Sequence, residues 1–107
     1  MKRFGQVIKI DPDKIDTYKS YHANPWPEIN EKISACNITN YSIYLKDDYL
    51  FAYFEYVGED LEADSAAMAA DPLTQKWWDI MKPLQQPIET RKEGEWWADM
   101  EEVYHLD

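Results

Sequence analysis

The sequence has little of several residue types on which common kinds of site depend. Its three glycines are isolated, so no glycine-rich loop of the phosphate-binding kind is present. Its two histidines, His22 and His105, lie far apart, and with one cysteine they form no cluster with metal-ligand spacing. Neither Ser20 nor Ser42 has a base at the spacing of a nucleophilic triad. We therefore expect chemistry that needs no metal and no cofactor.

Basic residues, paired cysteines and long apolar runs are also scarce. The chain has 11 Lys and Arg against 21 Asp and Glu, a net charge of −10, which repels phosphate backbones and anionic lipid surfaces. The lone Cys36 excludes an intrachain disulfide, so folding does not require an oxidising compartment. No apolar run reaches the roughly 18 residues of a membrane span, and no apolar segment follows the first residues. We expect a soluble cytoplasmic protein that binds neither nucleic acid nor membrane.

The order of the predicted elements indicates a fold class. The length of 107 residues suits one hydrophobic core, so we expect a single domain over residues 1–107. Alternating apolar and polar residues predict four strands, at 4–10, 40–46, 49–57 and 102–106. Helical spacing with Asp-Pro starts predicts helical segments at 12–22, 24–36, 61–70 and 72–81, and the polar stretch 84–95 is expected to be a loop.

This order predicts an α+β, ferredoxin-like βαββαβ arrangement, in which helices cover one face of an antiparallel sheet. The chain is rich in aromatic residues, with five Trp and eight Tyr, and the strands carry rings on both faces. Rings that carry a polar atom suit a subunit interface as well as a core. We therefore expect a homodimer, in which the sheets of two chains pack against each other and form a dimeric α/β-barrel.

The stretch from Tyr18 to Glu28 is the strongest candidate for a catalytic site. Tyr18 and His22 are four residues apart, so they share one face of a helix. Pro25 and Pro27 then force the chain to restart, and Asn24 is expected to cap the second helix. Histidine titrates near pH ~6.5, so His22 can both donate and accept a proton. The alternative is a partly buried structural histidine that donates to a carbonyl.

Two tryptophan pairs and the second histidine are weaker candidates. Adjacent helical residues point about 100° apart, so one of Trp77 and Trp78 is expected to pack inward and the other to face a cleft, where a ring can stack on a sugar. The alternative is that both serve the core or a dimer contact. The pair at 96–97 is assigned to packing or an interface. His105 is assigned to structural packing, with Glu101 and Glu102 close enough to orient it.

Four motifs together resemble the L-rhamnose mutarotase family. They are Tyr18-x-x-x-His22-x-x-x-Trp26-Pro27-Glu28, Asn40-Tyr41-Ser42-Ile43-Tyr44-Leu45, Gln75-Lys76-Trp77-Trp78-x-x-Met81 and Glu102-Val103-Tyr104-His105-Leu106. The resemblance implies a ferredoxin-like domain that dimerises through its sheets and interconverts the α and β anomers of L-rhamnose without a cofactor. It implies His22 as the catalytic acid, and it implies sugar contacts from Tyr18, Tyr41, Trp77 and Trp78.

The sequence departs from the family pattern at two places. Asn37 stands where the family usually has glycine, and asparagine tolerates the same left-handed backbone. The acidic loop before Trp96 has no clear counterpart in the family pattern. If that loop borders the site, we expect the sugar preference to differ from that of the family. Two other functions remain as alternatives: a cofactor-free monooxygenase on the same dimeric fold, and a non-catalytic sugar-binding module.

Overall fold

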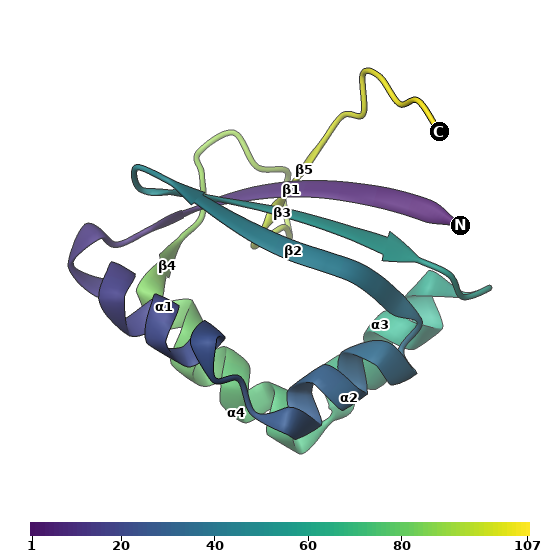
Figure 1. The fold of residues 1–107 in the computed structure, drawn as a ribbon, viewed down its shortest axis with the longest axis horizontal. Coiled ribbons are helices and arrows are strands. Elements are labelled where there is room, and N and C mark those ends of the chain that lie inside the picture. The colour runs from purple at the N-terminus through teal and green to yellow at the C-terminus, as the bar shows by residue number, and fades with distance from the viewer.

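A curved antiparallel sheet is covered on one face by helices, and the structure, a computed structural model, describes all of residues 1–107 (Figure 1). The strands are β1 (Lys2–Ile10), β2 (Ile38–Lys46), β3 (Tyr49–Tyr56), β4 (Gln85–Gln86) and β5 (Ala98–Met100). The α-helices are α1 (Ile15–Ala23), α2 (Pro27–Ala35), α3 (Leu61–Ala70) and α4 (Pro72–Met81), and short 3-10 helices occupy Pro12–Lys14 and Lys82–Leu84. None of the helices combines the length and the apolar character needed to cross a bilayer.

The sheet has the strand order β2-β3-β1, with β4 and β5 both paired to the remaining edge of β1. Strands β1 and β3 pair antiparallel over nearly their whole length, from Lys2 opposite Tyr56 to Lys9 opposite Tyr49. Strand β4 pairs with the end of β1, and β5 pairs with its middle. The fourth strand position of the predicted ferredoxin-like fold is therefore filled by two short strands. The α+β, ferredoxin-like prediction is confirmed.

The predicted last strand at 102–106 is wrong. The strand of that region is β5, and residues 101–107 have no regular structure and extend away from the body of the molecule (Figure 1). The register pairs Met100 with Gly5, so continuing it would place Val103 opposite Lys2, where β1 begins. A strand continued beyond Val103 would therefore have no partner on β1. The predicted loop at 84–95 also needs correction, because it contains β4.

The helix starts follow local residue chemistry, with one correction. Asp11 and Asp71 were predicted as caps, and each carboxylate accepts a backbone N–H at 3.0 Å, from Asp13 and Thr74 respectively. Asn24 was predicted to cap the second helix, but it ends α1 instead. The reason is that α2 begins at Pro27, and a residue before proline is disfavoured in the helical region, so Trp26 is extended and occupies the cap position.

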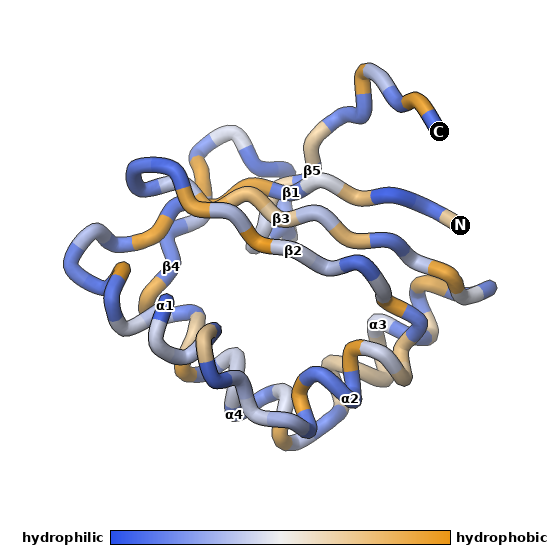
Figure 2. The backbone as a smooth tube through the Cα atoms, viewed as in Figure 1, coloured by the Kyte–Doolittle hydropathy of each residue, from blue (hydrophilic) through white to orange (hydrophobic).

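The core lies between the inner face of the sheet and the helices. Ile8, Ile10 and Leu50 are fully buried there, together with residues of α1, α2 and α4. Apolar segments accordingly occur in both layers, whereas the C-terminal tail alternates apolar and polar residues in the open (Figure 2). The outer face of the sheet carries exposed rings, including Tyr44, Tyr49 and Phe51. The sheet is thus apolar on both faces, although helices cover only one.

Asn37 has the left-handed backbone predicted for it, with φ of 67°, and its side-chain amide donates to Asp64 at 2.9 Å. Replacing Asn37 by alanine is expected to lower the free energy of unfolding by about 1 kcal/mol, because a Cβ-bearing residue without a compensating polar group is strained there. Asn37→Gly is expected to lower it less, since glycine adopts this conformation freely. Urea denaturation measures both variants, and an alanine variant as stable as the glycine variant would contradict this account.

Candidate active site

A cleft between the inner face of the sheet and the helices brings together all the residues predicted to form the site. A cavity of about 340 Å³ is lined by Tyr18, His22, Tyr41, Trp77 and Trp78. A neighbouring hollow of about 560 Å³ shares three of these side chains with it, those of His22, Tyr41 and Trp77. The five residues come from α1, β2 and α4, so only the folded chain places them around one space.

His22 lies in the last turn of α1 with one ring nitrogen already engaged. Its Nδ1 is 2.8 Å from the backbone carbonyl oxygen of Tyr18, which can only accept, so Nδ1 carries the hydrogen. The imidazole stacks on the Tyr18 ring, with centroids 4.1 Å apart, and it meets the Trp77 ring edge-on at 5.5 Å. His22 therefore has features of both interpretations, the structural and the catalytic: it donates to a carbonyl, and it lines the cavity. Nε2 is the nitrogen left for chemistry.

The surroundings of His22 favour its neutral form. Burial lowers the pKa of His22 below its ordinary value, and the hydrogen bond to the Tyr18 carbonyl opposes this only in part. At neutral pH the imidazole is therefore mainly uncharged, with a lone pair on Nε2. A neutral imidazole acts first as a base, by accepting a proton from the substrate, and the resulting imidazolium then acts as an acid, by donating that proton back.

The two tyrosines of the cleft are held in their protonated form. Tyr18 is buried, and burial raises the pKa of its phenol, with a smaller contribution from nearby Tyr41. Burial around the hydroxyl of Tyr41 likewise raises the pKa of that group. Tyr41 lies within an irregularity in the β2–β3 register, between Thr39 and Ser42. Both phenols are hydrogen-bond donors at physiological pH and not bases.

The paired tryptophans of α4 have different surroundings. Trp77 is buried and makes edge-on contacts with Tyr21 and Trp26, at centroid distances of 5.9 and 5.1 Å, in addition to His22. Trp78 is half-buried, and the ammonium of Lys82 lies 5.7 Å from the centre of its ring. Both rings line the cavity. Trp77 is therefore part of the core and of the cavity wall, whereas Trp78 belongs mainly to the wall.

Sequence reasoning missed several residues of the cleft. Trp96 and Trp97, assigned to packing or an interface, line the cavity, and so do Gln85 and Lys82. The indole N–H of Trp96 donates to the side-chain oxygen of Gln85 at 2.8 Å. One signal was present: a tryptophan in a polar loop carries a donor that usually finds a partner. The partner itself was hidden because Gln85 lies in a stretch that reads as an exposed loop.

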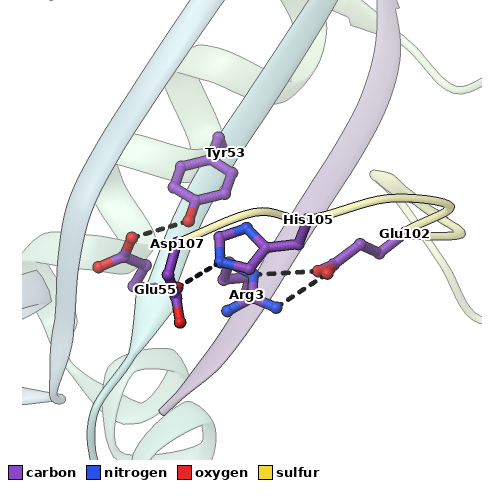
Figure 3. Close-up of polar contacts among 6 residues, drawn as sticks. All are labelled: Arg3, Tyr53, Glu55, Glu102, His105 and Asp107. Carbon is purple, nitrogen blue, oxygen red and sulfur yellow. Dashed lines mark hydrogen bonds and ion pairs between the residues drawn. The ribbon is translucent and has the colours of Figure 1, made fainter.

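His105 lies outside the cleft. It is on the C-terminal tail, where its Nε2 is 2.7 Å from the carboxylate of Asp107 (Figure 3). The prediction that Glu101 or Glu102 orients it is wrong, because the carboxylate of Glu102 accepts two hydrogen bonds from Arg3 across the sheet edge (Figure 3). No three His, Cys, Asp or Glu side chains are grouped so that they could hold a metal ion.

Comparisons with known proteins identify the family of this chain. The family described as L-rhamnose mutarotase matches residues 3–106. L-Rhamnose mutarotases of Oceanobacillus iheyensis and Bacillus subtilis are 36% and 34% identical to this chain, each with 100% of both chains covered. Two solved structures share the fold. The crystal structure of an L-rhamnose mutarotase from Formosa agariphila has a TM-score of 0.77 and 22% sequence identity to this chain. A tetracenomycin F2 cyclase from Streptomyces glaucescens has a TM-score of 0.71 and 14% identity, and both alignments cover 100% of both chains. This chain belongs to the L-rhamnose mutarotase family.

Proposed function

We propose that this protein, acting through the single domain of residues 1–107, is an isomerase that interconverts the α and β anomers of L-rhamnose without a cofactor. The observation that carries the proposal is the imidazole of His22, which has Nδ1 committed to a carbonyl and lines an aromatic cleft. Membership of the family and the mutarotase names of the relatives support the choice of sugar. A cytoplasmic location stays a prediction from the sequence.

The reaction needs one proton to move between two neighbouring oxygens. Nε2 of His22 accepts the proton of the anomeric hydroxyl as the ring C1–O5 bond breaks, and the imidazolium then donates that proton to O5. Rotation of the aldehyde about C1–C2 followed by the reverse steps gives the other anomer. Both oxygens are bonded to C1, so one imidazole can serve them in turn. Opening and reclosing each begin with the neutral imidazole as the base and end with its protonated form as the acid.

The other residues of the cleft bind and orient the sugar in this proposal. The phenols of Tyr18 and Tyr41 donate hydrogen bonds to sugar oxygens, since both are kept protonated. The rings of Trp77 and Trp78 contact the apolar C–H faces and the methyl group of a deoxysugar. These side chains supply apolar surface and donors but no permanent charge, which fits an uncharged monosaccharide.

Anomer exchange measured by saturation-transfer NMR tests the function. We expect the wild-type protein to accelerate magnetisation transfer between the anomeric protons of α- and β-L-rhamnose. Saturable binding of the sugar without acceleration would identify a sugar-binding module instead. Oxygen uptake with an aromatic or quinol substrate, together with no effect on anomer exchange, would identify a monooxygenase.

The pH dependence of the rate should report the state of His22. Because the neutral imidazole starts the reaction, kcat/KM is expected to rise with pH through the pKa of His22 and then reach a plateau. Burial lowers that pKa, so the inflection should lie below the ordinary histidine value of about 6.5. The measurement is the exchange rate between pH 4.5 and pH 8. A rate that falls as pH rises through this range would show that the protonated imidazole starts the reaction.

We also propose that the protein is a homodimer, with the outer face of the sheet as the interface. This face exposes Tyr44, Tyr49 and Phe51, and the nearby tail exposes Val103 and Leu106. Rings exposed in this number on one side of a sheet are unusual for a monomer. Sedimentation velocity at micromolar concentration tests the proposal, and a monomer there would contradict it.

A further inference from the structure

Gln85 and Trp96 join the site from β4 and from the loop that follows it. Trp96 belongs to the acidic loop between β4 and β5, and Gln85 is the first residue of β4. Both line the same cavity as Tyr18 and His22. Gln85 is buried, whereas Trp96 is 36% exposed. The loop therefore borders the site through Trp96, whose indole contacts the buried amide of Gln85.

The hydrogen bond from Trp96 determines how the Gln85 amide is oriented. The two ends of a glutamine amide have nearly the same shape, so their assignment depends on the partners. An indole N–H can only donate, and it lies 2.8 Å from one end of the amide, so that end must be the carbonyl oxygen. The amide NH₂ then points to the opposite side, where its nitrogen is 3.5 Å from the hydroxyl oxygen of Tyr18. This contact is long, at the upper limit for a hydrogen bond.

This orientation limits what the Tyr18 hydroxyl can do. An amide NH₂ group has no acceptor, so the oxygen of Tyr18 receives from Gln85 and the hydroxyl hydrogen must point elsewhere. No hydrogen bond donated by Tyr18 to another protein group accompanies this contact, and the phenol faces the cavity. The hydroxyl hydrogen is thus available to an acceptor within the cleft.

We propose that Gln85, held by Trp96, is a positioning residue that turns the Tyr18 hydroxyl hydrogen into the cleft, so that Tyr18 acts as a donor to a substrate oxygen. The proposal rests on the proposed function, since the oxygen is that of the sugar. Through Trp96, the loop between β4 and β5 would thus help to orient the substrate.

Reversing the direction of the Gln85–Tyr18 hydrogen bond tests the proposal. In Gln85→Glu, one carboxylate oxygen still accepts from Trp96, but the other accepts the Tyr18 hydroxyl hydrogen and withdraws it from the cleft. We expect kcat/KM for anomer exchange, measured at the pH plateau of each variant, to fall about tenfold, the size of one well-placed hydrogen bond. Gln86→Glu is the matched control, because it makes the same change at the next, exposed residue, and its rate should stay within about twofold of wild type.

The Tyr18→Phe background separates positioning from a structural effect. Without the phenol, Gln85→Glu has no hydroxyl to redirect, so the double variant should be no slower than Tyr18→Phe alone. The uncharged Gln85→Met should also slow the wild-type reaction and have no further effect in Tyr18→Phe. In ¹H–¹⁵N spectra, Gln85→Met should move the indole resonance of Trp96, which is assigned by its loss in Trp96→Phe.

The outcomes distinguish this proposal from the proposed function. An active wild-type protein in which both Gln85 variants match Gln86→Glu would overturn the positioning role and leave the mutarotase function intact. The same rate loss with and without the Tyr18 hydroxyl would overturn it too, because the loss would then be structural. A wild-type protein that does not accelerate anomer exchange would overturn both.

Discussion

Replacing His22 by alanine is expected to lower kcat/KM for anomer exchange by about 10²–10⁴-fold, the usual contribution of a positioned acid–base group. The physical reason is that no other group of the cleft can take its place. The phenols of Tyr18 and Tyr41 have raised pKa values and cannot accept a proton at neutral pH. Lys82 also lines the cavity, but its Nζ lies over the rings of Trp78 and Trp96, 5.7 and 5.6 Å from their centres. Saturation-transfer NMR with L-rhamnose measures the rate.

His105→Ala is the matched control for this experiment. It removes the other histidine of the chain, which contacts Asp107 on the tail and does not line the cleft. Its exchange rate is expected to stay close to that of wild type. If His22→Ala retained both sugar binding and the wild-type rate, the imidazole would have no part in the chemistry.

Replacing Trp77 by alanine is expected to lower the free energy of unfolding by about 3–5 kcal/mol, as for a large buried ring removed from a core. The Trp77 ring contacts Tyr21, His22 and Trp26 at once, so its loss opens a space between α1, α2 and α4. Domains of this kind have a total stability of about 5–15 kcal/mol, so the loss is a large share of the whole. Urea denaturation followed by circular dichroism measures it.

Trp78→Ala is the matched control, since it removes the same side chain one residue later. Trp78 is half-buried and lies over the cavity beside Lys82, so its removal leaves a smaller hole in the core. We expect a loss of about 1–2 kcal/mol in stability. We also expect a rise in KM for the sugar with kcat less affected, because a stacking surface binds substrate and transition state alike. Equal destabilisation by the two replacements would contradict the division of roles between them.

Local sequence patterns predicted part of the candidate site. The spacing of Tyr18 and His22 places both on one helix face, and the structure brings the two rings within 4.1 Å. The adjacent tryptophans on α4 were expected to face different surroundings, and Trp77 and Trp78 differ in burial in that way. The inclusion of Tyr41 came from the family resemblance, because nothing in a strand pattern says which other element that strand faces.

Local patterns could not predict that Gln85 and Trp96 contribute to the site. Their hydrogen bond joins a two-residue strand to a residue in an irregular loop, and neither has a periodic pattern. The last strand was misplaced for a related reason. Residues 102–106 alternate as a strand does, but the register of β5 reaches the first residue of β1 at Val103, so residues 104–106 would have no partner strand.

The amino-acid sequence by itself determined the helix starts at Asp-Pro, the left-handed turn at Asn37, the alternation of β1 and β3 and the pairing of Tyr18 with His22. These depend on backbone preferences and on spacing within one element, which are local properties. Only the tertiary structure decided where the final strand ends, which nitrogen of His22 is free, and that Gln85 of β4 faces the Tyr18 hydroxyl. Those features depend on contacts between residues far apart in the chain, and such contacts exist only once the sheet and helices have packed together.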